Sequence, residues 1–150
     1  MRATYRILAL LIAAGVVVQA AFIAVAWFQV IHELDSGSVF DKNYEGNWGH
    51  MGHTVVGSGV IPILAILLLI LSFFARIPGG VKWAAITFGV VALQVLFAVL
   101  SFGAPVVGLL HGINAFALAA VASIAARKAR LAETATPRPS PASARPRSSG

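Results

Sequence analysis

The sequence predicts an all-α membrane protein, a four-transmembrane-helix up-down bundle with both termini in the cytoplasm. Hydrophobic residues make up 59% of its 150 residues and charged residues only 11%, against about 45–50% and about 25% in a soluble domain. The apolar residues gather into four continuous stretches, each close to the length of about 20 residues that crosses the hydrocarbon core. Ten of the eleven Lys and Arg residues fall on one side of such a four-span arrangement.

The four stretches are free of Asp, Glu, Lys and Arg. Continuous apolar runs indicate helices, because membrane strands alternate between apolar and polar residues. Pro and Gly in the segments 76–80 and 101–105 end one helix before the next begins. We expect spans at about 7–31, 54–75, 83–101 and 105–126, with an outer loop at 32–53.

The charges give the orientation of the spans. Lys42 alone among the Lys and Arg residues shares the outer side with four of the five acids. The positive-inside rule then predicts a multi-pass protein of the bacterial plasma membrane with cytoplasmic N- and C-termini. The net charge of +6 therefore indicates topology, and we expect no nucleic-acid partner. The first span is too long for a cleaved signal core, so we expect it to be retained.

Two regions follow from this composition. Residues 1–126 form the transmembrane domain, and 127–150 form a cytoplasmic tail rich in Pro, Ser and Arg. The tail lacks apolar periodicity and is expected to be disordered. It serves either as a solubilising extension or as a weak attractor of anionic lipid headgroups.

The four histidines all lie on the predicted outer side. His32 ends the first span, His50 and His53 lead into the second, and His111 lies about two turns into the fourth. The second and fourth spans enter the membrane in the same direction, so His53 and His111 can reach the same depth. Two neutral imidazoles facing each other across a bundle can ligate a haem iron. The competing interpretation is that a histidine at a membrane interface only snorkels.

Other residues near this pair fit a haem pocket. Gly57 lies four residues after His53 and lets the backbone come close. Asn114 lies three residues after His111, and Gln94 lies mid-way along the third span. Both amides are candidate hydrogen-bonding partners of the cofactor or its ligands. Alternatively, Gln94 bonds across the bundle to Gln19 in the first span.

The outer loop offers a different site. His32 and His50, with His53 and the loop acids, are a weak alternative set of zinc or copper ligands, and the alternative is a solvated loop. The sequence contains no nucleophile–base pair, phosphate loop or dinucleotide-binding motif. It therefore favours a binding protein over an enzyme.

The segments Gly49-His50-Met51-Gly52-His53 and Leu109-Leu110-His111-Gly112-Ile113-Asn114-Ala115 resemble the histidine motifs of haem A synthase. In that family, each of two four-helix halves carries haem-ligating histidines on its second and fourth helices. The resemblance covers about 7–126, one half, and implies axial ligands at His53 and His111. The family has a glutamate three residues before the histidine of the second helix, and this sequence has His50 at that position. The chain also resembles uncharacterised small four-helix membrane proteins of high-GC bacteria that share Leu-His-x-x-Asn-Ala.

Three functions follow from these observations. The first is a cytochrome-like membrane protein that binds haem b between His53 and His111, for electron transfer or haem handling. The second is a non-catalytic four-helix membrane protein that serves assembly or interaction without a cofactor. The third is a metal-handling or transport protein. The expected partners are the lipid bilayer, a second copy of the chain in a homodimer, and a redox protein or another membrane protein.

Overall fold

The computed structural model describes residues 1–135, which form helices joined by turns and contain no strand. Its α2, π-helix and α3 follow one another directly and make one rod. With this rod, the described residues contain four helices long and apolar enough to cross a membrane, as the sequence predicts. The elements are α1 Arg2–Asp35, α2 Trp48–Val55, the π-helix Val56–Val60, α3 Ile61–Ser72, α4 Gly80–Gly103, the 3-10 turn Pro105–Val107 and α5 Gly108–Thr134.

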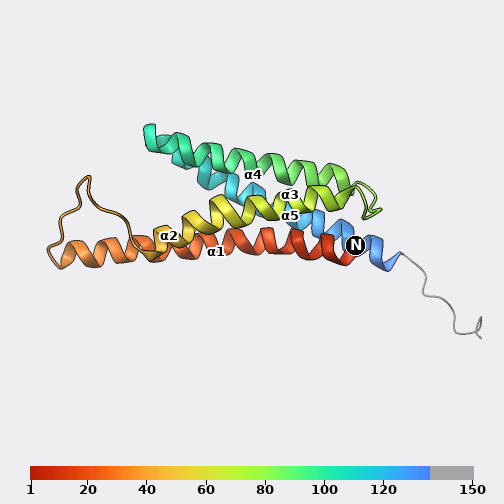
Figure 1. Ribbon diagram of the computed structural model, residues 1–150, viewed down its shortest axis with the longest axis horizontal. Helices are drawn as coiled ribbons and strands as arrows, with labels where there is room; N and C mark the ends of the chain where they lie inside the picture. Colours follow the sequence, from red (N-terminus) through yellow and green to blue (C-terminus); the bar gives the residue numbers. More distant parts are fainter. Residues whose placement is uncertain (136–150) are drawn as a thin grey trace, which may run out of the picture.

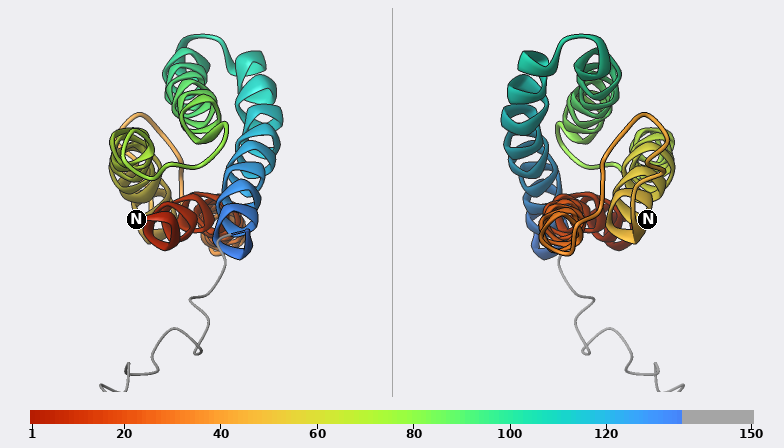
Figure 2. Two further views of the ribbon diagram at one scale, coloured as in Figure 1. Left: turned by 90° about the vertical axis from the view of Figure 1, so that its right-hand side faces the viewer. Right: turned by 90° about the vertical axis from the view of Figure 1, so that its left-hand side faces the viewer.

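The helices pack side by side in the order α1, α5, α4, α3 around a common axis. Helix α1 packs between α3 and α5, and α4 packs between the same two neighbours. Figure 2 views this arrangement from each end. Successive long helices run in opposite directions, and the N-terminus lies at the same end as the last turns of α5 (Figure 1). Helices α1 and α4 are therefore diagonal partners.

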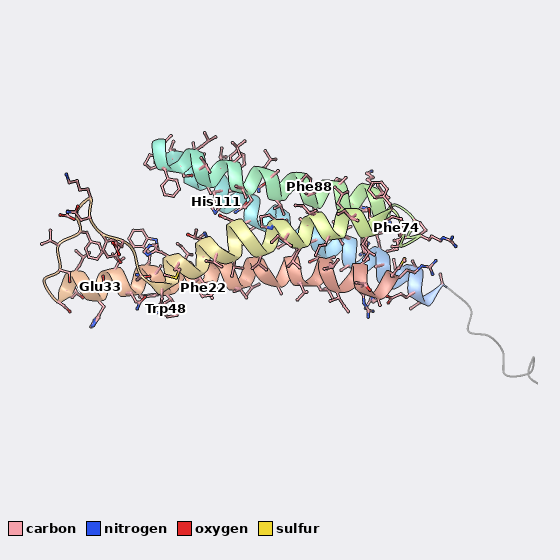
Figure 3. The ribbon with its side chains drawn as sticks, viewed as in Figure 1. Phe22, Glu33, Trp48, Phe74, Phe88 and His111 are labelled. Atoms are coloured by element: carbon pink, nitrogen blue, oxygen red, sulfur yellow. The ribbon has the colours of Figure 1, made fainter. Side chains whose placement is uncertain are left out.

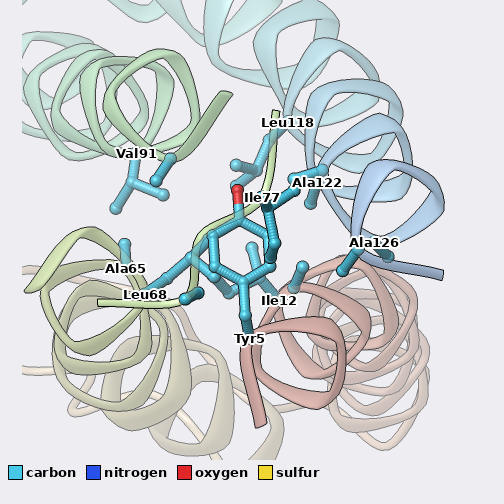
Figure 4. Packing of buried hydrophobic residues seen from close by; sticks show 14 of the residues in the cluster. Tyr5, Ile12, Ala65, Leu68, Ile77, Val91, Leu118, Ala122 and Ala126 are labelled. Atoms are coloured by element: carbon cyan, nitrogen blue, oxygen red, sulfur yellow. The ribbon is translucent and has the colours of Figure 1, made fainter. Parts of the chain in front are cut away.

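The core is densest toward the end that holds the N-terminus. Tyr5, Ile12, Leu68 and Leu118 are its largest fully buried apolar side chains, and Figure 4 shows them converging between the helices. Most of the other buried residues are alanines, whose small size lets the helix backbones approach closely. The Tyr5 hydroxyl donates a 2.8 Å hydrogen bond to the carbonyl of Gly80. That bond satisfies a buried polar group and ties α1 to the start of α4.

The opposite end is splayed. Helix α2 packs against α1 but makes no close packing with α4 or α5. Figure 1 shows α4 and the start of α5 diverging from α1 and α2. The α1–α2 contact depends on Gly49, because a Cβ there would lie 2.6 Å from the backbone nitrogen of Ala26. The bundle is therefore closed at one end and opens into a cavity at the other.

Helix α2 begins at a capping box. The Asn47 side-chain oxygen accepts hydrogen bonds from the backbone N–H groups of Gly49 and His50, at 3.0 and 3.3 Å. The His50 Nδ1 in turn accepts from the Asn47 backbone N–H at 3.3 Å. These bonds satisfy donors that a helix start leaves unpaired. They start α2 before the apolar run and so place His53 on a helix.

The helices are longer than the apolar runs predict. Helix α1 ends at Asp35 and α2 starts at Trp48, so the non-helical connection between them covers 36–47, inside the predicted outer loop of 32–53. Helix α5 continues to Thr134, so 127–134 is helical and the predicted tail begins too early. A 2.9 Å ion pair between Arg6 and Glu133 holds this end of α5 against α1. The rest of the predicted tail, 136–150, lies outside the described residues.

Candidate functional site

A cavity of about 580 Å³ lies between the four helices at the splayed end. This volume falls within the range of about 300–1,000 Å³ typical of small-molecule sites. Its base is apolar and buried, with Ile61 5% and Leu118 2% exposed, and its rim includes Trp27 and Phe102 at 61% and 92%. Polar groups reach it from every long helix, among them Gln19, His53, Ser58, Gln94 and His111.

The structure brings His53 and His111 together in this cavity. Their ring centroids lie 6.2 Å apart, and the ring planes meet at 63°. His53 comes from α2, and His111 lies in the first turn of α5. Figure 3 shows His111 in the half of the molecule where α4 and α5 diverge from α1. The two rings therefore approach across the gap that the splayed helices leave.

Each histidine is oriented by a backbone carbonyl. The Nδ1 of His53 lies 3.2 Å from the carbonyl oxygen of Gln19, and the Nδ1 of His111 lies 3.0 Å from that of Gln94. A carbonyl oxygen can only accept a hydrogen bond, so each Nδ1 is the protonated donor. In a neutral ring the Nε2 then carries a free lone pair. Metal-ligating histidines almost always have this second hydrogen bond.

The His111 ring also belongs to an amide network between α4 and α5. The Gln94 side-chain amide donates to the His111 carbonyl at 3.0 Å and lies 3.2 Å from the His111 Nε2. Asn114 donates to the Gln94 side-chain oxygen at 2.6 Å and to the carbonyl of Val90 at 3.0 Å. In this structure the Nε2 of His111 therefore accepts a hydrogen bond from the side-chain amide of Gln94.

The expected bond between Gln94 and Gln19 does not form, because the Gln94 side chain bonds to His111 and Asn114 instead. The Gln19 amide is buried instead, and neither its nitrogen nor its oxygen has a hydrogen-bond partner within residues 1–135. Leaving a buried polar group unpaired costs about 1–3 kcal/mol. A ligand in the cavity that Gln19 lines would supply the missing partner.

Gly57 makes room for this amide. A Cβ at position 57 would lie 3.1 Å from the Gln19 side-chain oxygen. Gly57 lies in the π-helix that joins α2 to α3 and lines the cavity. Single π turns inside α-helices are frequent at functional sites. The sequence singled out Gly57 as a small residue near His53, and its closest neighbour is the side chain of Gln19.

The other two histidines do not join the site. The His50 ring caps α2 through Asn47 and stacks edge-on against Tyr44, with centroids 6.4 Å apart. His32 is exposed near the end of α1. Across the described part of the chain, no three His, Cys, Asp or Glu residues lie close enough to hold a metal ion. The outer-loop metal site thus has no support from the structure.

Two features of the site were missed by sequence reasoning. The backbone carbonyls of Gln19 and Gln94 orient the histidines. Every residue has a backbone carbonyl, so the residue type does not indicate which carbonyl will accept such a bond. The π-helix at Val56–Val60 also has no sequence signal, although two glycines in five residues mark a segment of weak helix propensity.

Comparison of the chain with protein-family models, with curated proteins and with solved structures gave no match. The likeness to haem A synthase thus depends on the histidine motifs alone and stays a hypothesis.

Proposed function

We propose that the protein is an integral protein of the bacterial plasma membrane that binds one b-type haem between His53 and His111, for electron transfer or haem handling. The observation that carries the proposal is the pair of imidazoles at 6.2 Å in an apolar cavity. Each has its Nδ1 on a backbone carbonyl.

The ring separation suits one metal ion between the two histidines. Bonds of about 2.0–2.1 Å from a metal to imidazole nitrogen, added to about 1.2 Å from each nitrogen to its ring centroid, give centroids about 6.4 Å apart across one ion. The observed 6.2 Å is close to that value. The separation of the two rings therefore leaves room for one metal ion between them.

The ligand set favours haem over a bare metal ion. Structural zinc takes four protein ligands, whereas the described residues that line this cavity include two histidines and no Cys, Asp or Glu. Haem brings four nitrogens of its own and needs only the two axial positions from the protein. The cavity's apolar walls and the unpaired Gln19 amide also suit a large, mostly apolar ligand with polar substituents.

The protein's own residues would fix the two ligands. The carbonyls of Gln19 and Gln94 hold each ring in one tautomer and one orientation, which raises the basicity of Nε2. The side chain of Gln94 must leave the His111 Nε2 before that nitrogen ligates, while the backbone bond to Nδ1 stays. When bound, haem supplies one-electron redox chemistry.

The charge distribution supports a membrane orientation with the site near the outer face. Lys42 lies in the connection between α1 and α2, at the splayed end. Arg2, Arg6, Arg76 and the basic residues at the end of α5 lie at the closed end, where Arg2 donates to the carbonyl of Arg76 at 3.3 Å. By the positive-inside rule, the closed end is cytoplasmic.

The test is the visible absorption spectrum of the protein purified in detergent after expression with added haem. We expect a Soret band and, on reduction, sharp α and β bands. His53→Ala and His111→Ala should each lose most of this absorbance, while the exposed His32→Ala should keep it. A colourless wild-type protein that also fails to bind added haem would contradict the proposal, as would equal spectra for all three variants.

A further inference from the structure

A second groove of about 370 Å³ lies at the closed end, between α1 and α5. Arg6 lines it from α1, and Arg127 and Arg130 line it from α5. The apolar side chains of Ile7 and Leu10 also line the groove, and they are 51% and 49% exposed. The groove therefore joins a cationic cluster to an exposed apolar surface.

Helix geometry makes the groove continuous. Residues 6, 7 and 10 share one face of α1, and 123, 127 and 130 share one face of α5, because residues three or four apart are neighbours on a helix. The helices are antiparallel. Along the bundle axis, Leu10 and Ser123 therefore both lie farther from the closed end than the arginines do. At 1.5 Å per residue, Ser123 lies about 10 Å from Arg130 along the axis of α5.

The cationic cluster keeps an excess of positive charge. Arg6 pairs with Glu133 at 2.9 Å, and Glu133 is the only acidic residue after Glu45 in the sequence. Arg127 and Arg130 are exposed on the same face. Three guanidinium groups against one carboxylate leave a site that attracts an anion. Arginine's planar fork of donors suits phosphate oxygens.

We propose that this groove binds an anionic phospholipid, with the phosphate among Arg6, Arg127 and Arg130 and an acyl chain along Ile7, Leu10 and Ser123. The arginines lie nearer the closed end than the apolar residues of the groove. A lipid of the cytoplasmic leaflet has the same order, because its headgroup lies nearer the cytoplasm than its acyl chains. Basic pockets between transmembrane helices on the cytoplasmic side are known to bind such headgroups. The inference depends on the membrane location proposed above and not on haem.

Binding of phosphatidylglycerol to the detergent-purified full chain tests the proposal, with phosphatidylcholine and inorganic phosphate as comparison ligands. Native mass spectrometry counts the lipids retained. Each basic residue near a charged lipid surface contributes about 1 kcal/mol, so Arg127→Gln with Arg130→Gln should weaken phosphatidylglycerol binding about 30-fold. Arg76→Asn with Lys82→Gln removes the same charge from the α3–α4 turn and the first turn of α4, and should weaken binding less than about threefold.

A third variant tests the apolar half of the groove. Ser123→Leu keeps every charge but fills the groove below the arginines, so it should also weaken phosphatidylglycerol binding. Far-ultraviolet circular dichroism checks that each variant is folded, and the haem spectrum of each should match the wild type.

Three outcomes would overturn the lipid site. Equal losses in the two charge variants would mean that only the total charge matters. Equal retention of phosphatidylcholine by the wild type would leave the arginines without a role. Displacement of phosphatidylglycerol by millimolar inorganic phosphate would identify a site for a free anion. None of these outcomes bears on the histidine pair, so failure of the lipid site and failure of the haem proposal are distinguishable.

Discussion

The substitution Gly49→Ala tests whether the α1–α2 contact positions His53. A Cβ at residue 49 would lie 2.6 Å from the backbone nitrogen of Ala26 and 2.8 Å from the carbonyl oxygen of Phe22. Ordinary contacts between non-bonded heavy atoms are about 3.5–4.0 Å. Both neighbours are backbone atoms, so no rotamer change relieves the clash. The helices must separate by about 1 Å, and overpacking of this kind costs about 1–3 kcal/mol.

A separation of α1 and α2 at Gly49 would also move His53, because His53 lies one turn after Gly49 on α2. Its 3.2 Å bond to the Gln19 carbonyl would lengthen past hydrogen-bonding distance if α2 moved by about 1 Å. We therefore expect Gly49→Ala to lower the unfolding temperature in detergent, followed by circular dichroism at 222 nm. It should also weaken haem binding in a titration followed at the Soret band.

Two glycines of the same rod provide graded controls. At Gly59 a Cβ meets nothing within 4 Å, so Gly59→Ala should keep or raise stability, since alanine favours helix. At Gly52 the three atoms nearest to a Cβ all belong to the ring of Phe22, a side chain that can rotate away, so Gly52→Ala should fall between the two. If Gly49→Ala unfolds at the same temperature as Gly59→Ala, the reasoning about backbone contact is refuted.

Three further substitutions test the polar groups. Gln94→Leu frees the His111 Nε2 from an amide bond of about 0.6 kcal/mol, so haem affinity in a Soret titration should rise about threefold, and a loss of binding would contradict this role. Gln19→Met removes a buried amide without a partner in the described chain and should stabilise the haem-free protein by about 1 kcal/mol; thermal unfolding that shows destabilisation would mean that the amide is satisfied. Tyr5→Phe removes the bond that ties α1 to the Gly80 carbonyl and should cost about 0.5–1.5 kcal/mol in denaturant unfolding, so an unchanged midpoint would contradict it.

The fold could be predicted to the level of four apolar helices because hydropathy alone decides which segments are that apolar. Helix ends depend on single polar contacts instead. The Asn47 capping box starts α2 before the apolar run, and the Arg6–Glu133 ion pair holds the last turns of α5. Neither contact is visible in composition, so the helix ends differ from the limits of the apolar runs at both places.

The site could be predicted in part. The meeting of His53 and His111 follows from span direction and depth, which the sequence supplies. The partners of Gln94 depend on which helices are neighbours, and four antiparallel spans can be arranged around an axis in more than one order. With α5 beside α4, the Gln94 side chain bonds to His111 and Asn114, and the Gln19 amide has no hydrogen-bond partner within residues 1–135.

The central claim is that His53 and His111 ligate one iron from opposite sides. The most direct measurement is electron paramagnetic resonance of the ferric, haem-loaded full chain, with the haem content per chain determined on the same sample. We predict one haem per chain and a low-spin signal with two imidazole ligands, replaced in His53→Ala and in His111→Ala by a high-spin signal or by loss of haem. A high-spin wild type, or a low-spin signal that survives both substitutions, would contradict the claim.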